Sequence, residues 1–292
     1  MSEDFDPSKF PTGLAEQMEP LVVRVLAGNP SPYTYTGTQT YLVGNQSDRA
    51  VIDPGPAIEE HIDAIVAAAA GAKITAIMCT HTHRDHSPAA KPLAARTGAK
   101  IIGCAPLVLE DDGPRADESF DKDYAPDQIL QDGERFAGDG WTIEAVATPG
   151  HTSNHLCLAV AESGAMFTGD HVMAWSTSVI VPPDGDMADY MASLQKIYER
   201  DDKVYYPAHG KKVDKPRQLV RGMMGHRKQR ERQILKLLEE GPYVIPDMVT
   251  QMYKGLDPRL KGAAGQSVRA HLVDLQNRSI VAVEGETWTI LS

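Results

Sequence analysis

The sequence predicts an α/β protein with a smaller C-terminal domain. Along residues 20–212, short segments rich in β-forming residues alternate with segments that carry helix signals, in two successive halves. After about Asp214 a long, charged helical segment begins instead. A chain of 292 residues with 42% hydrophobic and 24% charged residues can bury a large core. We therefore expect a main domain over residues 1–213 and a second domain over residues 214–292.

The elements of the first half follow from apolar runs and cap residues. A helix over 58–70 carries acidic residues near its positively polarised N-terminus. A second helix is predicted to begin at Ser87-Pro88, a cap residue followed by proline at the first helical position, and to run to Arg96. Strands are predicted near residues 21–27, 40–43, 50–52, 74–80 and 100–103.

The second half repeats this mixture after a loop. Residues 105–128 are rich in Asp, Gly and Pro, which predicts a long irregular connection. A helix is expected over about 187–199, and strands near 142–148, 155–160, 165–168 and 204–206.

A cluster of metal-ligand side chains follows the strand predicted at residues 74–80. Within six positions the chain places His81, His83, Asp85 and His86. Imidazole and carboxylate groups bind zinc, manganese or iron at neutral pH. The alternative interpretation is a histidine-rich surface loop or a purification tag. We favour a metal site because the run is internal and directly follows a strand.

Three further residues of ligand type also follow predicted strands. His151 comes after a Pro-Gly turn, Asp170 after a Thr-Gly turn, and His209 just before Gly210. Singly, each is more often an ordinary core, surface or turn residue. Together with the histidine cluster they make four strand ends that carry ligand-type side chains, and such ends can meet at one edge of a sheet.

These motifs resemble those of the metallo-β-lactamase superfamily, over about residues 20–212. In order, they are His81-Thr-His83-Arg-Asp85-His86, Pro149-Gly-His151-Thr, Thr168-Gly-Asp170 and Pro207-Ala-His209-Gly. The C-terminal extension adds a likeness to the β-lactamase-like protein 2 subfamily, and glyoxalase II is more distantly similar. The resemblance implies a four-layer αβ/βα sandwich as the catalytic domain. It also implies that His81, His83 and His151 bind one metal ion, that Asp85, His86 and His209 bind another, and that Asp170 bridges the two.

This ligand set indicates an open, catalytic site rather than a closed, structural one. The resemblance implies two zinc ions per chain, with manganese or iron as alternatives. It further implies a hydrolase in which a hydroxide between the zinc ions attacks an ester, amide or phosphodiester. Asp85 and Asp170 are the candidate catalytic residues, because either carboxylate can accept or orient the proton of that water.

Other side chains are candidates for supporting roles. Asp53, His155 and Thr152 are expected to hold ligand imidazoles in place. The alternative for Asp53 is the first position of a Pro-Gly turn. Asn154 and His155 are also candidate donors to a developing oxyanion. Trp175 either stacks on a ring or base of the substrate or forms a wall of the core.

The substrate class stays open at this point, because superfamily members hydrolyse lactams, thioesters, lactones and RNA with nearly the same ligands. An endoribonuclease acting on single-stranded RNA is the sharpest alternative, although a net charge of −11 opposes polyanion binding. Promiscuous β-lactamase activity and a thioesterase of glyoxalase II type are further alternatives. The last alternative is a non-enzymatic protein that metal ions only stabilise. We disfavour it, because such a scaffold does not need an open metal site.

The C-terminal residues are predicted to form a winged-helix-like domain. A helix over 216–240 is followed by helices over 246–253 and 267–277 and by a hairpin over 279–292. One interpretation is contact with nucleic acid through this domain and the basic helix before it. The other, which we favour, is a solvated charged face on a domain that braces the active-site edge. The basic residues are Arg217, Arg221, Arg227, Lys228, Arg230, Arg232 and Lys236.

We expect a small molecule or single-stranded RNA as substrate and no membrane partner, because no apolar run approaches the length of a membrane-crossing helix. The acidic N-terminus lacks the pattern of a signal peptide. Three cysteines without a C-x-x-C pair are predicted to be small buried hydrophobes. These features together predict a cytoplasmic protein. A single sequence does not reveal the oligomeric state.

Overall fold

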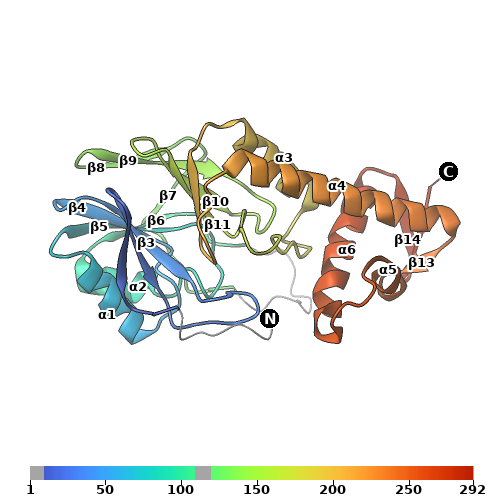
Figure 1. Cartoon of the computed structure of the whole chain (residues 1–292), viewed down its shortest axis with the longest axis horizontal. Coiled ribbons are helices and arrows are strands. Elements are labelled where there is room, and N and C mark those ends of the chain that lie inside the picture. Colours follow the sequence, from blue (N-terminus) through green and yellow to red (C-terminus); the bar gives the residue numbers. More distant parts are fainter. Residues whose placement is uncertain (1–9, 109–119, 292) are drawn as a thin grey trace. The chain divides into compact units, whose positions relative to one another are not determined.

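The computed structural model describes residues 10–108 and 120–291 (Figure 1). Residues 109–119, which belong to the predicted loop over 105–128, lie outside this description. The chain divides into two compact units. The predicted boundary between residues 213 and 214 stays a prediction, because two internal segments group with the C-terminal residues. The first unit contains residues up to 148, 154–177 and 201–216, and the second contains 149–153, 178–200 and 217–292.

A seven-stranded sheet dominates the first unit, and its strand order follows chain order from β1 to β7. Neighbouring strands are antiparallel from β1 to β4 and parallel from β4 to β7. Parallel neighbours need crossover connections, and the helices α1 and α2 supply the first two. The strands are β1 (Ala15–Glu19), β2 (Val22–Leu26), β3 (Gln39–Gly44), β4 (Asp48–Ile52), β5 (Lys73–Cys79), β6 (Lys100–Gly103) and β7 (Gln128–Ile129).

Both crossover helices pack on this sheet (Figure 1). Helix α1 (Glu59–Ala68) contacts β2 and β3, and α2 (Ala90–Thr97) contacts β5 and β6. Helix α2 starts two residues later than predicted, and Ser87 does not cap it. The Ser87 hydroxyl donates instead to Asp121 Oδ2 over 2.7 Å. The Ser87 hydroxyl therefore makes a long-range hydrogen bond to Asp121 instead of the helix cap that the local sequence pattern predicts.

A five-stranded sheet completes the first unit, in the order β12-β11-β10-β9-β8. Its strands pair antiparallel except for β11 and β12, which are parallel. One hydrophobic cluster contains buried residues of both sheets, including Tyr41 from the first and Phe167 from the second, whose ring centroids lie 4.9 Å apart. The strands are β8 (Arg135–Gly138), β9 (Trp141–Ala147), β10 (Leu156–Val160), β11 (Ala165–Gly169) and β12 (Val204–Pro207).

The second unit has its own hydrophobic cluster, in which Ile234, Leu272 and Trp288 are buried. Its sheet has the order β13-β15-β14, and β14 and β15 form the predicted hairpin. Helix α6 begins at Lys261 rather than Ser267, because Ala264 packs into this cluster and extends the buried face of the helix. The elements are α3 (Met187–Glu199), α4 (Pro216–Glu240), β13 (Tyr243–Val244), α5 (Ile245–Met252), a short 3₁₀ helix (Pro258–Leu260), α6 (Lys261–Asn277), β14 (Val281–Glu284) and β15 (Thr287–Ile290).

None of the helices in the described parts of the chain is both long enough and apolar enough to cross a lipid bilayer.

Candidate metal centre

The predicted histidine cluster forms the turn that leaves β5. The three histidines of this turn are almost completely buried, with His81 and His86 at 0% exposure and His83 at 8%. Asp53, which follows β4, fixes the start of the turn by accepting hydrogen bonds from the backbone N–H and the hydroxyl of Thr80, each over 2.8 Å. The ends of two neighbouring parallel strands are thereby joined under the cluster.

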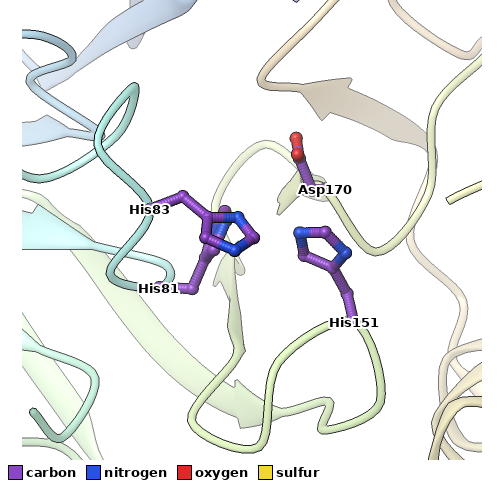
Figure 2. Close-up of side chains that lie close together, drawn as sticks. All are labelled: His81, His83, His151 and Asp170. Atoms are coloured by element: carbon purple, nitrogen blue, oxygen red, sulfur yellow. The ribbon is translucent and has the colours of Figure 1, made fainter. Parts of the chain in front are cut away.

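Four of the seven predicted ligands form one group. The imidazoles of His81, His83 and His151 and the carboxylate of Asp170 offer ligand atoms that all lie within 4.8 Å of one another. Figure 2 shows these side chains converging from three separate parts of the chain. Groups this close, drawn from the turns after β5, β9 and β11, match the spacing that a single ion needs.

The other three predicted ligands form a second group of the same kind, comprising Asp85, His86 and His209. The Nε2 atoms of His86 and His209 lie 3.5 and 3.1 Å from Asp85 Oδ2. The same two nitrogens lie 3.6 and 3.3 Å from Asp170 Oδ1. Asp170 therefore borders both groups.

The far nitrogen of each of three ligand rings is held by an oxygen atom. His86 Nδ1 lies 3.0 Å from Asp53 Oδ2, His209 Nδ1 lies 3.2 Å from the Gly37 carbonyl, and His151 Nδ1 lies 2.6 Å from the Val179 carbonyl. An oxygen partner at Nδ1 leaves Nε2 as the nitrogen that could coordinate a metal ion, and it fixes the plane of the ring. The sequence pointed to Asp53 but not to the two carbonyls.

Glycine is required at the turn that presents Asp170. Gly169 has φ of +48°, and a Cβ at this position would lie 2.6 Å from Thr80 Oγ1 and 2.7 Å from His155 Nε2. His155 in turn accepts a hydrogen bond from the backbone N–H of Asp170 over 3.3 Å and contacts Thr148 Oγ1 through Nδ1. The position of the Asp170 carboxylate is thus set by a close backbone approach and by a buried imidazole.

The charges of the second group favour a cation. Burial acts to raise the pKa of Asp85, but His86 and His209 hold that pKa well below its usual range. Burial acts to lower the pKa of both imidazoles, yet the adjacent Asp85 and Asp170 carboxylates hold these pKa values above the ordinary one. The carboxylates therefore favour positive charge at this point, and either protonated imidazoles or a bound cation provides it.

The hydrogen bonding of His86 and His209 also agrees with a metal ion in the second group. The Nε2 atoms of His86 and His209 are buried and make no regular hydrogen bond. A buried polar nitrogen without a partner is costly, and metal coordination removes that cost. Together with the imidazole and carboxylate donors, this makes the two groups potential metal-binding sites.

The two predicted oxyanion donors, Asn154 and His155, make hydrogen bonds to other parts of the chain. The Asn154 amide donates to Thr82 Oγ1 and to the Ala105 carbonyl over 3.1 and 2.7 Å. His155 is 1% exposed and holds Asp170, as described above. Sequence proximity to His151 suggested an oxyanion role, whereas the folded chain uses both side chains to join loops.

An aromatic pair and a cavity lie beside His209. The Trp175 ring stacks on Tyr35 at 5.0 Å between centroids, and 36% of Trp175 is exposed. Tyr35 and Gly210, the residue after His209, also line a cavity of about 380 Å³. The other lining residues are Phe10, Pro11, Leu14, Ala15, Glu16, Arg24, Leu26, Thr36 and Lys211.

Comparison with protein families gives two matches. A model described as the metallo-beta-lactamase superfamily matches residues 33–209, and one described as the beta-lactamase associated winged helix domain matches residues 245–288.

Comparison with individual proteins agrees. A beta-lactamase-like protein 2 homolog from Caenorhabditis elegans is 33% identical over 91% of this chain and 88% of its own length. An atrochrysone carboxyl ACP thioesterase from Aspergillus fumigatus is 34% identical over 76% of this chain and 66% of its own length. A solved beta-lactamase domain protein from Burkholderia ambifaria has a TM-score of 0.79 at 18% identity, covering 96% of this chain and 94% of that one. This last likeness concerns the fold alone.

Proposed function

Because the chain belongs to the metallo-β-lactamase superfamily, we propose that it is a hydrolase that works with two metal ions, zinc in each site. The observation that carries the proposal is the position of Asp170, which belongs to one ligand group and lies 3.3–3.6 Å from two imidazoles of the other. A carboxylate in that position can bridge two ions. Three remaining ligands on each side leave room for water and substrate.

The chain's own groups have separable roles. When bound, a zinc pair supplies an acidified water and stabilises negative charge on the attacked group. Asp85 stays ionised, because the neighbouring imidazoles hold its pKa well below its usual range, so it can accept or orient the proton of the attacking water. Asp53 and the carbonyls of Gly37 and Val179 keep the ligand rings aligned.

We propose a thioester as the substrate class. Water adds to the carbonyl carbon, the carbon–sulfur bond breaks, and the departing thiolate takes up a proton. Two observations support this choice: a relative of 34% identity is named as an ACP thioesterase, and the cavity beside Gly210 combines apolar walls with Arg24 and Lys211. Apolar walls suit an acyl chain, and Lys211 suits an anionic group attached to it, whereas Arg24 already forms an ion pair with Glu16.

A competition among substrate classes tests this function. Purified protein is incubated with an acyl thioester, single-stranded RNA and nitrocefin at equal concentrations, with and without chelator. We expect thioester hydrolysis that chelator abolishes and that Asp85→Asn lowers by about 10²–10⁴-fold. The exposed Asp201→Asn is the matched control and keeps full activity. A preparation that binds no metal and hydrolyses none of the three substrates contradicts the proposal.

Cleavage of single-stranded RNA is the second candidate. It is favoured by five basic residues that α4 exposes to solvent, where a phosphate backbone could reach them. Two other arginines of α4 are not counted among these, because Arg227 is buried and Arg230 lies over the Tyr253 ring, 4.4 Å from its centroid. RNA products that disappear in Asp85→Asn, without thioester turnover, would replace the first candidate by this one. The exposed residues are Arg217, Arg221, Lys228, Arg232 and Lys236.

A further inference from the structure

Arg227 on α4 is a buried cation with unusual surroundings. Its exposure is 3%, and among the described residues no carboxylate forms an ion pair with it. Its Nη2 donates to the Ser178 carbonyl over 2.5 Å and its Nη1 to Ser267 Oγ over 3.4 Å. The guanidinium also lies over the Tyr190 ring, 5.2 Å from the centroid. Burying a charge without a counter-charge is expensive, so this arrangement needs a reason beyond packing.

The segment that Arg227 holds leads directly to a predicted metal ligand. Ser178 accepts the guanidinium N–H, and the carbonyl of the next residue, Val179, lies 2.6 Å from His151 Nδ1. The Tyr190 hydroxyl adds a contact to Ser178 Oγ at 3.2 Å. Arg227 therefore holds the peptide between Ser178 and Val179, and the carbonyl of the next peptide, between Val179 and Ile180, faces the His151 ring.

The loop that carries His151 is fastened to the same part of the molecule. Gly150, with φ of +133°, packs so closely on the backbone of Tyr190 that a Cβ would lie 2.4 Å from it. The Gly150 carbonyl accepts the backbone N–H of Asp186 over 3.0 Å, and the Pro149 carbonyl accepts the Ser193 hydroxyl over 2.8 Å. Residues 149–153, 178–200 and 217–292 belong to one compact unit, which agrees with these contacts.

We propose that Arg227 is a positioning residue for the metal centre, an inference that rests on the proposed function. By fixing the carbonyl of Ser178, Arg227 sets the direction of the Val179 carbonyl, and that carbonyl sets the tautomer and plane of the His151 ring. Helix α4 then contributes to the placement of the His151 ring without supplying a ligand itself. Partners of ligand imidazoles typically account for 10–100-fold of metal affinity.

The test compares two arginines of the same helix. Arg227→Met removes the donor to Ser178 and keeps an apolar stem, while Arg230→Met removes a guanidinium that contacts Tyr253 and Gln233. Zinc affinity and stoichiometry are measured by competition with a chromophoric chelator, and the cobalt-substituted proteins are compared by their visible absorption. Arg227→Lys, which keeps the charge and one donor direction, serves as the milder variant if Arg227→Met does not fold.

We expect Arg227→Met to weaken one of the two zinc sites by 10-fold or more and to alter the cobalt spectrum, with Arg227→Lys intermediate. Arg230→Met should lower stability without changing either readout. Wild-type affinity and spectrum in both Arg227 variants would overturn the positioning role while leaving the proposed function intact. A wild-type protein that binds no metal would instead refute the proposed function itself.

Discussion

At the scale of single residues, Asp53 joins the metal centre to the sheet. Its two carboxylate oxygens accept hydrogen bonds from Thr80 and face His86 Nδ1 at 3.0 Å. Its φ of +46° is one that Asp and Asn tolerate better than most residues. A carboxylate is needed here because three donors meet two oxygen atoms at a 2% exposed position.

Replacing Asp53 by Asn should therefore weaken metal binding while the fold is kept. The amide keeps the shape and tolerates the same φ, but it offers one acceptor where Thr80 and His86 require two. We expect a 10–100-fold loss of zinc affinity at the site containing His86, measured by chelator competition. Asp201→Asn is the control. Equal affinities in the two variants would mean that Asp53 only shapes the turn.

A second residue-scale prediction concerns Gly150. An alanine Cβ would lie 2.4 Å from the Tyr190 backbone at a φ of +133°, so Gly150→Ala must shift the loop that carries His151. We expect a loss of at least about 2 kcal/mol in unfolding free energy, measured by urea titration, together with weaker metal binding. Gly222→Ala on α4, where an added Cβ would meet no atom outside its own stretch of helix within 4 Å, should instead gain about 0.5–1 kcal/mol. Equal stability of the two variants would contradict the prediction.

The gathering of the seven candidate ligands could be predicted from sequence, and so could Asp53 as a supporting residue, whereas the backbone carbonyls that face His151 and His209 could not. His81, His151, Asp170 and His209 follow strands, and the ends of strands meet, so their residue types already indicate a common site. Every residue has a carbonyl group, so nothing local distinguishes Val179 as the partner of His151. Only the folded chain identifies it. Whether the seven residues hold metal stays a prediction.

At the scale of secondary structure, elements with a clear apolar pattern or a cap signal matched prediction better than strands without one. Strand β5 and helices α3 and α4 lie where apolar patterns and caps predicted them, α3 and α4 to the residue. Strands β1 and β8 were not predicted, because their side chains remain largely exposed and carry no apolar alternation. Their pairing with neighbours, rather than their own composition, makes them strands.

Helix α6 carries a testable pH dependence. Burial, aided by the charges of Arg227 and His226, lowers the pKa of His271 to about 3 from an ordinary 6.5. The folded chain thus binds one proton fewer than the unfolded chain between these values. Stability is then complete above pH 6.5 and falls with decreasing pH, by about 1.4 kcal/mol per pH unit at most.

His271→Leu should remove this dependence. Neither ring nitrogen of His271 has a hydrogen-bond partner, so an apolar side chain costs little at neutral pH. We expect the unfolding free energy of the variant to fall less than that of wild type between about pH 7 and pH 5.5, as measured by urea titration. Parallel losses in both proteins would show that other groups govern acid stability.

At the scale of the whole molecule, the predicted α/β fold with a C-terminal winged helix is confirmed by the family matches. It was predictable because strand and helix signals alternate strongly and the ligand motifs keep a fixed order along the chain. The substrate, the oligomeric state and the cytoplasmic location stay predictions, because they depend on surfaces and partners that local patterns do not encode. The net charge of −11 says only that a polyanion needs a segregated basic face.

Metal removal should destabilise the molecule as a whole. The clustered imidazoles and carboxylates favour a cation, so a metal that binds only the folded chain stabilises it by mass action. At free zinc about 100 times the dissociation constant, we expect about 2.7 kcal/mol, seen as a higher Tm than in chelator. Asp170→Asn should reduce this shift, because Asp170 borders both ligand groups. The same Tm in zinc and in chelator would contradict the prediction.

The three thiols of the chain have a practical consequence for spectroscopy. Cys79, Cys104 and Cys157 are fully buried and form no disulfide bond in the described parts of the chain, and burial raises the pKa of Cys104 to about 12 and that of Cys79 well above its usual value. Maleimide reagents attack exposed thiolates, so they should pass over all three. A single cysteine placed on an exposed helix position, such as Glu239→Cys, can then carry a fluorophore or spin label in an otherwise native chain.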